Sequence, residues 1–380
     1  MKIALIGQKG IPAKQGGVEK HVQELSTRLA QAGFDVTAYC RPHYTGEKKK
    51  NYKKVKIVNL PSINTKHLDA ISHTFLATIH SLFQNYDIIH YHGVGPSLLS
   101  WIPRLLNPKT KVIVTFHSVD RKQQKWGLFA RVMLTVGEWT ACHFPHETIT
   151  ISQTLQKYCL FKFDTETIYI PNGVQISNQK KKKAILEQYG LEPKKYFLVA
   201  SRLVKHKGIQ TLIKAYQKIK TDKKLVIVGG GSNTGNFTEE LKNLARPTSN
   251  IVFTGEQVGL ELETLFRNAY LFVQPSEAEG LSIALLEAMS YGLPVIVSDI
   301  EENLEAMDGH GLSFKNKNVN DLSRQLNFAI KHPIIISKNA KLAKRQTDKK
   351  YNWDDIVSRT IGLYEQTIIS DKQLVLQKAK

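Results

Sequence analysis

Apolar and polar positions alternate along the first half of the chain between two kinds of segment. Short runs that are apolar throughout, beginning with residues 3–6, are typical of strands buried on both faces of a parallel sheet. Longer segments place apolar residues three or four positions apart, as at Val18, Val22, Leu25 and Leu29, which is the stripe of an amphipathic helix. This alternation predicts an α/β, doubly wound, Rossmann-like domain. The further predicted strands are 36–39, 57–60, 88–91, 112–116 and 148–151, and the predicted helices are 68–83, 97–106, 128–139 and 153–161.

The same alternation returns after an interruption. Pro171, Asn172 and Gly173 form a turn signal, and residues 180–183 are consecutive lysines, so we place a domain junction here. We predict an N-terminal Rossmann-like domain over 1–175, a C-terminal one over 176–355, and a C-terminal helix over 356–380 that packs back toward the N-terminal domain. The predicted strands of the second domain are 197–200, 225–228, 251–254, 271–274 and 295–298, followed by a helical tail from about Asp321. Ligands bind at the switch points of such sheets, so a cleft faced by both domains is expected.

Composition and charge narrow the class of protein. The chain has 380 residues with 42% hydrophobic and 23% charged residues, which fits two globular domains. Its formal net charge of +20 indicates a polyanionic partner, namely nucleic acid, an anionic membrane face or phosphorylated substrates. Cys40, Cys142 and Cys159 show no metal or redox spacing, and no run of 18 apolar residues occurs. We expect a cytoplasmic protein, peripheral on the membrane at most.

Two glutamates flank a predicted helix start in the segment 274–289. Glu279 lies at the entry to a helix predicted to begin near Leu281, and Glu287 lies about two turns in, so on one helix they would be about 12 Å apart. That is too far for an acid/base pair on one glycosidic bond, but it suits the two ends of an extended ligand. Between them, the amides of Gly280, Leu281 and Ser282 would form a helix N-terminus suited to an anion. The plain alternative is a helix-start charge and a surface glutamate.

A basic loop follows the first strand of the second domain. Arg202 and Lys207 lie at the carboxyl end of that strand, where they could neutralise a diphosphate. Taken alone, such a loop is usually a solvated one. Together, the Arg…Lys-Gly loop and the Glu-x7-Glu segment resemble the family-4 retaining glycosyltransferases in order, spacing and strand-loop-helix context. The resemblance covers nearly the whole chain and includes the glycine loop at residues 15–19.

The resemblance implies a role for each matching residue. Arg202 and Lys207 would bind the donor diphosphate, and Glu279 would contact hydroxyls of the transferred sugar. Glu287 would hold the ribose. The remaining donor-binding positions would be backbone groups at Gly16 and Gly17, the nucleobase loop at Gly255 and Glu256, and the helix start at Gly280, Leu281 and Ser282.

The first domain contributes His117, just past a predicted strand. In the family, a histidine at this place lies beside the donor sugar and the acceptor. The stretch from Asp120 to Gly127 resembles a bacterial polysaccharide-building subgroup with many rhamnosyltransferases, and Asp120 is a candidate acceptor contact. His92 and His90 end the preceding strand, and His92 is a second candidate for the acceptor. A lone histidine after a strand is otherwise an ordinary polar residue.

No metal or other cofactor is expected. Glycosyltransferases of the other major fold bind a divalent cation through Asp-x-Asp, and no Asp-x-Asp occurs in this sequence. Arg202, Lys207 and the helix N-terminus can carry the leaving-group charge instead. The resemblance implies transfer of a sugar from a nucleotide-diphosphate donor to a glycan or polyprenyl-diphosphate-linked acceptor, with retention. The alternatives are a sugar-nucleotide 2-epimerase on the same fold and a non-catalytic binding protein.

The basic surplus has a second candidate explanation. Between Pro96 and Gly137, basic residues outnumber the single acid Asp120, and Trp101, Trp126 and Phe129 lie among them. Such mixtures suit the anionic cytoplasmic leaflet or a lipid-diphosphate acceptor, although a solvated face explains them as well. No zinc-finger, RNP or helix-turn-helix pattern supports nucleic acid as the partner. The basic residues are Arg104, Lys109, Lys111, Arg121, Lys122, Lys125 and Arg131.

Overall fold

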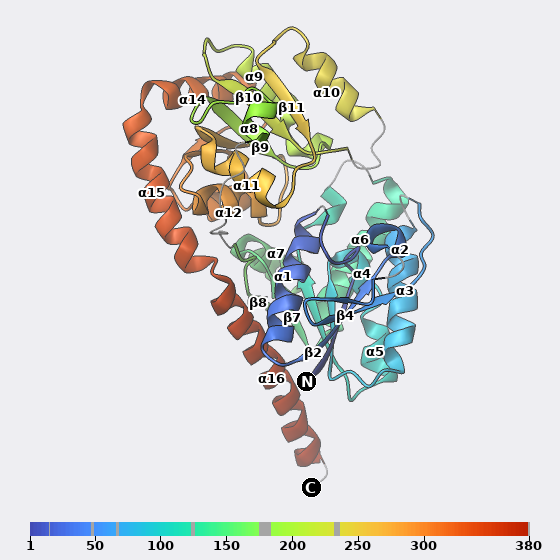
Figure 1. Cartoon of the computed structure of the whole chain (residues 1–380). Coiled ribbons are helices and arrows are strands. Elements are labelled where there is room, and N and C mark those ends of the chain that lie inside the picture. Colours follow the sequence, from blue (N-terminus) through green and yellow to red (C-terminus); the bar gives the residue numbers. More distant parts are fainter. Residues whose placement is uncertain are drawn as a thin grey trace. The chain divides into compact units, whose positions relative to one another are not determined.

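The structure is a computed structural model, and it divides the chain into two units with one sheet each (Figure 1). It describes residues 1–14, 16–46, 49–65, 68–122, 126–174, 184–231 and 236–378, with the backbone alone at 122 and 371–378. Gln15, Lys125, the lysine run at 180–183 and the predicted boundary after residue 175 lie outside these residues. Unit 1 comprises Met1–Asn172 and Trp353–Lys380, and unit 2 comprises Gly173–Asn352.

Eight strands form the sheet of unit 1, in the order β3-β4-β2-β1-β5-β6-β7-β8. All neighbours are parallel except β3 and β4. Because β1 pairs with β2 on one side and β5 on the other, the order reverses between β1 and β5 and creates a switch point. The strands are β1 Lys2–Ile6, β2 Asp35–Cys40, β3 Asn51–Tyr52, β4 Val55–Asn59, β5 Ile88–His92, β6 Lys111–Phe116, β7 Glu147–Thr150 and β8 Ile168–Tyr169. The helices are α1 Gly17–Gln31, α2 Pro42–Thr45, α3 Asp69–Leu82, α4 Val94–Ser97, α5 Trp101–Leu106, the 3-10 turn η1 Asp120–Lys122, α6 Leu128–His143, α7 Gln153–Phe163 and α16 Trp353–Lys378.

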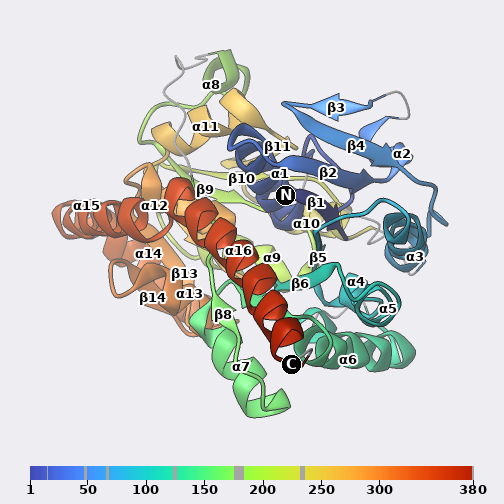
Figure 2. The same ribbon diagram turned by 90° about the horizontal axis from the view of Figure 1, so that it is seen from below.

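The predicted doubly wound fold is confirmed in unit 1, with one error among its helices. The segment 97–106 was predicted as a single helix, but it forms α4 and α5 with a turn between them. Pro103 has no amide proton for the carbonyl of Leu99 and its ring clashes with that carbonyl, so it kinks or breaks an α-helix that would run through this position. Pro103 instead lies in the first turn of α5, where helical amides lack partners in any case. Helices α3, α5 and α6 lie on the same side of unit 1 (Figures 1 and 2).

Six parallel strands form the sheet of unit 2, in the order β11-β10-β9-β12-β13-β14. The first strand, β9, pairs with β10 on one side and β12 on the other, so the switch point lies between β9 and β12. The strands are β9 Tyr196–Ala200, β10 Lys224–Val228, β11 Ile251–Gly255, β12 Leu271–Gln274, β13 Val295–Ser298 and β14 Leu312–Phe314. The helices are α8 Ala184–Gln188, the 3-10 turn η2 Lys205–Lys207, α9 Ile209–Tyr216, α10 Phe237–Ala245, α11 Gly259–Asn268, α12 Ile283–Ser290, α13 Glu301–Met307, α14 Val319–Lys331 and α15 Pro333–Lys350.

The helical tail after Asp321 is confirmed, and its last helix completes the core of unit 1. Ile356 and Tyr364 of α16 are buried in the same apolar cluster as Val22 and Leu25 of α1. The hydroxyl of Tyr364 lies 2.7 Å from Nδ1 of His90, a residue of the central strand β5. Unit 2 is therefore inserted between two segments of unit 1. No helix within the described residues has both the length and the apolar character needed to cross a bilayer.

The two points at which the chain passes between the units lie next to each other. Val174 and Asn352, both in unit 2, form an isolated parallel bridge. The amide of Val174 donates a hydrogen bond to the carbonyl of Tyr351 at 2.9 Å. The outgoing and returning segments are thus tied together by backbone hydrogen bonding rather than by side chains alone.

Candidate active site

The switch point of unit 2 brings the two chemically richest loops of the sequence together. The loop after β9 carries Lys207, and the loop after β12 carries Glu279. Where the loops touch, the amide of Glu277 donates to the carbonyl of His206 at 2.7 Å. Gly208 has φ +69°, and a Cβ there would lie 1.9 Å from the carbonyl oxygen of Pro275. Glycine is therefore required for this close approach.

Lys207 and Glu279 form an ion pair at this junction. Their Nζ and Oε1 atoms are 2.5 Å apart, and only 15% and 9% of the two side chains are exposed. Gln274, the last residue of β12, donates its amide to the same Oε1 at 2.7 Å and to the hydroxyl of Ser276 at 2.8 Å. The pair joins residues 72 positions apart in the chain. It fixes the Glu279 carboxylate at the carboxyl edge of the sheet.

The protonation state of Glu279 follows from two opposed effects. Burial alone raises the pKa of this carboxyl, but the charge and hydrogen bond of Lys207 outweigh burial and leave the pKa below its ordinary value. The hydroxyl of Ser276 and the charge of His206 act in the same direction as Lys207. Glu279 is therefore an ionised hydrogen-bond acceptor at neutral pH, which suits contact with ligand hydroxyls and not proton donation.

Arg202 provides a second cation in the loop after β9. It lies one residue past the start of the same loop, and its side chain is half-buried. Within the described part of the chain, its guanidinium has neither a hydrogen bond nor an ion pair. The charge of Lys207 is balanced by Glu279, whereas the charge of Arg202 is not balanced. The loop can thus bind an added anion through a planar, multidentate donor.

The loop predicted to face a nucleobase lies at the same edge of the sheet. The amide of Gly229, just after β10, donates to the carbonyl of Gly255 at 2.8 Å. A Cβ on Gly230 would lie 2.3 Å from Oε1 of Glu256, so this carboxylate rests against the backbone of the neighbouring loop. The amide of Leu203 donates to the carbonyl of Gly230 at 2.9 Å. Three consecutive edge loops of unit 2 therefore form one surface.

The predicted helix start after Glu279 falls two residues later than expected. Helix α12 begins at Ile283, and Ser282 is its N-cap, with its hydroxyl accepting from the amide of Leu285 at 3.3 Å. Gly280 and Leu281 are buried in the loop before it. Glu287 is half-buried in α12. Only Glu287 is on the helix, so the 12 Å estimate for two glutamates on one helix does not apply.

In unit 1, four histidines gather beneath α1 at the carboxyl edge of the sheet. His90 and His92 alternate along β5, His117 follows β6, and His21 comes from α1. Nδ1 of His92 lies 3.2 Å from Nε2 of His117, and the ring of His21 packs edge-on against His117 with 5.0 Å between centroids. His90 bonds Tyr364 and Thr115 through its two nitrogens, at 2.7 Å each.

All four imidazoles are neutral at physiological pH. Burial lowers the pKa of His21 to about 4 and that of His90 to about 3. Burial, reinforced by neighbouring histidines, holds the pKa values of His92 and His117 well below 6.5. Nitrogens of His21, His92 and His117 lie within 4.8 Å of one another, and neutral imidazoles are the form that binds transition metals. These three residues could hold such an ion, although the His92–His117 hydrogen bond and the packing of the His21 ring on both also bring them together without one.

His92 was predicted to contact the acceptor, but in the structure it is buried. Only 1% of its surface is exposed, and its Nδ1 faces His117. His92 therefore lies behind His117 in the unit. Asp120, the other candidate, opens the turn η1 and accepts from the hydroxyl of Ser118 at 2.6 Å. Asp120 is half-buried and so remains accessible.

The glycine loop before α1 already holds an anion of the chain itself. Gly16 is the N-cap of α1 with φ +97°, and Gly17 is the first helical residue. A Cβ on Gly16 would lie 2.0 Å from Oε2 of Glu19, and Oε1 of Glu19 accepts from the amide of Lys9 at 3.3 Å. The Glu19 carboxylate thus occupies the N-terminal end of this helix. A diphosphate that used the backbone of Gly16 and Gly17 would have to displace it.

Sequence reasoning missed three residues that build these sites. His21 occupies the buried face of α1 between Val18 and Val22, so the apolar stripe itself contained the signal. Gln274 is a polar residue that directly follows the apolar run of β12. Ser276 gave no signal, since its importance depends on the hydrogen bond from Gln274.

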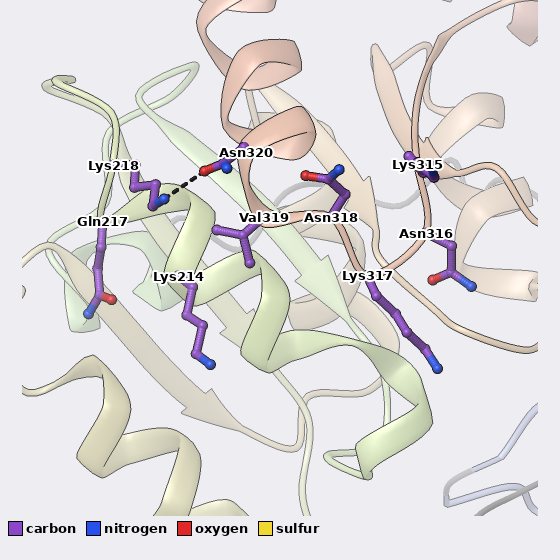
Figure 3. A pocket seen from close by; sticks show the side chains of 9 residues that line it. All are labelled: Lys214, Gln217, Lys218, Lys315, Asn316, Lys317, Asn318, Val319 and Asn320. Atoms are coloured by element: carbon purple, nitrogen blue, oxygen red, sulfur yellow. Dashed lines mark hydrogen bonds between the residues drawn. The ribbon is translucent and has the colours of Figure 1, made fainter.

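Unit 2 also has an open hollow of about 700 Å³ away from these residues. Figure 3 shows its lining side chains, which come from the end of α9 and the two residues after it, and from residues 315–320 at the start of α14. Lys218 donates to Oδ1 of Asn320 at 2.6 Å, and Lys317 pairs with Glu277 at 3.2 Å. Neither Arg202, Lys207 nor Glu279 lines the hollow. It is distinct from the predicted site.

Two doubly wound units in one chain, with basic and acidic side chains at a switch point, are the architecture of the GT-B class of glycosyltransferases. The family model Glycosyltransferase Family 4 matches residues 15–178, and the model Glycosyl transferases group 1 matches residues 181–353. The chain belongs to this family-4, group 1 type of glycosyltransferase, and similar proteins are named for O-antigen and teichuronic acid biosynthesis.

Individual relatives are similar over different shares of the chain. An uncharacterized glycosyltransferase of Methanocaldococcus jannaschii is 25% identical over 96% of this chain and 98% of its own. The N,N'-diacetylbacillosaminyl-diphospho-undecaprenol alpha-1,3-N-acetylgalactosaminyltransferase of Campylobacter jejuni is 28% identical over 50% of this chain and 49% of its own. The structure of Anabaena HepE in complex with UDP and glucose has a TM-score of 0.80 and 17% identity, and the match covers 96% of this chain and 100% of that one.

Proposed function

We propose that the protein is a retaining, metal-independent glycosyltransferase that moves a hexosyl group from a nucleotide-diphosphate donor to a hydroxyl of a glycan or polyprenyl-diphosphate-linked acceptor. The observation that carries this proposal is the buried Lys207–Glu279 pair at the switch point of unit 2, with Arg202, which has no ion-pair partner among the described residues, in the same loop as Lys207. A nucleotide-sugar has an anionic centre and two hydroxylated ends, which corresponds to this set of groups.

The donor would lie along the edge loops of unit 2. Arg202 and Lys207 would bind the diphosphate, and each charge-assisted hydrogen bond would contribute about 1.5–3 kcal/mol. Glu279, ionised and fixed by Gln274, would accept from hydroxyls of the sugar. Glu287 would hold the ribose, and the loop of Gly255 and Glu256 would face the base. The UDP in the similar Anabaena structure supports a nucleotide donor.

Metal independence rests on the charges that the chain itself supplies. The negative charge that develops on the leaving diphosphate would be stabilised by Arg202 and Lys207 together with the first turn of α12. No Asp-x-Asp occurs anywhere in the sequence to bind a bridging cation. We therefore expect transfer to proceed without added divalent ions.

His117 would act at the reacting sugar as a neutral hydrogen-bonding group. Among the residues that the structure describes, Nε2 of His92 is buried without a hydrogen-bond partner, and an unpaired buried N–H is costlier than an unpaired lone pair. This favours the tautomer in which His92 donates from Nδ1 to Nε2 of His117, so the proton of His117 is on Nδ1. The sugar–phosphate bond would break with oxocarbenium character, and the acceptor would enter on the face that the diphosphate leaves. A leaving phosphate oxygen would take the acceptor proton.

The acceptor is proposed from the relatives and from the basic character of the chain. The Campylobacter relative is named for a diphospho-undecaprenol acceptor, which supports a lipid-linked one here. Asp120 would contact the acceptor, while His92 would support His117 from behind. The resemblance of residues 120–127 to a rhamnosyltransferase-rich subgroup puts rhamnose among the donor sugars to be tested.

The first experiment is a thermal-shift screen with UDP, GDP and dTDP, with and without magnesium. A ligand at about a hundred times its dissociation constant adds roughly 2.7 kcal/mol of apparent stability, which is readily visible. Stabilisation by one nucleotide without magnesium is the expected result. No shift with any of the three would count against the donor site.

Two further measurements separate the alternatives. A 2-epimerase would convert the nucleotide-sugar without an acceptor, whereas we expect turnover only when an acceptor is added. A binding protein would keep its function in variants that lack the reactive groups. We expect Glu279→Ala and Lys207→Ala to lose donor binding or transfer, and wild-type activity in both would refute the site assignment.

A further inference from the structure

Helix α6 of unit 1 exposes a continuous apolar stripe. Leu128, Val132, Val136 and Trp139 are four, four and three positions apart, so they lie along one side of the helix, and all are exposed. Phe129 extends the stripe at its first turn. Leu128 and Phe129 are 82% and 79% exposed, although burying either side chain would lower the free energy.

The fold does not need this stripe. The opposite side of α6 already packs on unit 1, where Ala141 and Cys142 are buried. A Cβ on Gly137 would lie 2.4 Å from the carbonyl oxygen of Val94, so α6 and α4 are in close backbone contact on that side. The exposed side is therefore an additional apolar surface and not an incompletely buried core face.

The charges around the stripe have one sign. Arg131 is exposed on the same turn as Leu128 and Val132. The only acid of α6, Glu138, is fully buried and accepts from the Arg121 guanidinium at 3.1 Å. The exposed surface of α6 thus combines apolar and cationic groups and carries no carboxylate.

Helix α5, on the same side of unit 1, continues this surface (Figure 2). Trp101, Leu105 and Leu106 are exposed on α5, and Lys109 is exposed just beyond its end. Arg104 of α5 contacts His146, which follows α6, so the two helices are joined at this end.

We propose that the exposed face of α6 docks on the surface of an anionic lipid bilayer. Its apolar side chains would enter the boundary between headgroups and acyl chains, while Arg131 would contact lipid phosphates. Trp139 suits this interfacial depth because its ring is apolar and its N–H is polar. A symmetric pairing of two copies would bring like charges together, so charge complementarity favours the anionic surface. The surface is independent of the transfer chemistry, because it includes none of the proposed site residues.

The test is vesicle flotation of the full chain with matched variants. Wild-type protein is expected to float with vesicles of phosphatidylcholine and phosphatidylglycerol, and to stay at the bottom with phosphatidylcholine alone. Leu128→Ser combined with Phe129→Ser should lower binding at least about ten-fold, and Arg131→Gln about five-fold. Ile334→Ser is the control, because Ile334 is an 84% exposed apolar residue of α15 in unit 2, and this variant should bind as wild type does.

The variants should fold normally, since the replaced side chains are largely exposed, and their thermal transitions check this. Flotation of the double variant equal to that of wild type would overturn the proposal, as would failure of wild type to bind the anionic vesicles at low salt. If the double variant instead converted a dimer to a monomer in sedimentation and left flotation unchanged, a second copy of the chain would cover this face. Nucleotide binding by the thermal-shift screen reports separately on the proposed donor site.

Discussion

Replacing Lys207 with methionine tests the electrostatics of the unit 2 site directly. The change removes the ammonium group but keeps an unbranched side chain of similar length. Glu279 then lies in a largely buried position without the ammonium group, although the Gln274 amide, the Ser276 hydroxyl and the charge of His206 remain. The effect should therefore depend on pH in a way that loss of packing would not.

The magnitude follows from burial and geometry. With 15% and 9% exposure and a 2.5 Å contact, the pair is much closer to a buried than to a surface ion pair. Removing one partner of a fully buried pair costs about 3–5 kcal/mol, and one charge-assisted hydrogen bond contributes about 1.5–3 kcal/mol. Because some solvent remains, we expect Lys207→Met to lower the free energy of unfolding by about 2–4 kcal/mol near neutral pH.

The sign of the pH dependence differs between the two proteins. In the native protein the pKa of Glu279 lies below 4.5, so the stability that the pair provides is present above 4.5 and is lost as the pH falls through the lower folded-state value. In the variant we expect burial, which is the largest single effect on this carboxyl, to dominate and to raise the folded-state pKa of Glu279 above 4.5. The folded variant then binds the proton more tightly than the unfolded chain, so the variant gains stability as the pH falls toward 4.5. The difference in free energy of unfolding between wild type and the variant must therefore become smaller as the pH falls, by at most about 1.4 kcal/mol per pH unit.

Urea unfolding at about pH 7.5 and about pH 5.5 measures this difference. All four tryptophans lie in unit 1, so far-UV circular dichroism is needed to follow unit 2, and tryptophan fluorescence reports on unit 1. The Lys207→Met/Glu279→Gln double variant is the control. It has no carboxylate at position 279, so its stability relative to wild type should not show the pH dependence expected for Lys207→Met. The pair would behave as an ordinary surface ion pair if wild type and Lys207→Met differed in free energy of unfolding by the same amount at both pH values, or by less than about 0.5 kcal/mol.

Three further predictions concern other residues of the two sites. Gly208→Ala should lower stability by at least about 2 kcal/mol and weaken nucleotide binding, because the added Cβ would meet the Pro275 carbonyl. Gly309→Ala is the control: Gly309 has φ +75° but open space around it, so this change should cost only about 1 kcal/mol. Equal losses of stability in urea unfolding would contradict the role of the close approach at Gly208. His92→Phe should lower kcat about two- to ten-fold and leave KM for the donor unchanged, since it removes only the hydrogen bond that orients His117; a change confined to KM would mean that His92 contacts substrate. Treatment with EDTA should leave transfer rates unchanged, and a loss that magnesium restores would refute the metal-independent mechanism.

The hydrophobic pattern predicted the fold because most strands are apolar on both faces. Runs such as residues 197–200 and 225–228 are apolar throughout, and the sheets have them at the expected places. Three short strands, β3, β8 and β14, have two or three residues each, which is too few for any periodicity to be visible. The order of the strands in each sheet was also beyond the pattern, since it depends on which strands pair and not on how apolar each one is.

The site was predicted only as far as single loops. Arg202, Lys207 and Glu279 could be placed at strand ends from the sequence, and the switch-point rule put their loops at one edge. That Lys207 binds Glu279 depends on β9 pairing with β12, although β10 and β11 lie between them in the chain. The carboxylate of Glu19 at the first turn of α1 is a similar case, because Glu19 could equally have pointed into solvent. Side-chain partners of this kind require three-dimensional positions.

The insertion of unit 2 into unit 1 sets the order in which the protein can fold during synthesis. Unit 2 is one continuous segment, so all its strands and helices are available once residue 352 has left the ribosome. Unit 1 must wait for α16, because His90 and its partner Tyr364 are 274 residues apart in the chain. Until then the four histidines at the carboxyl edge of the unit 1 sheet lack α16, the helix that packs on them through Tyr364. A nascent chain should therefore pass through a stage with a folded unit 2 and an incomplete unit 1, which is a stage at which a chaperone would find exposed apolar surface.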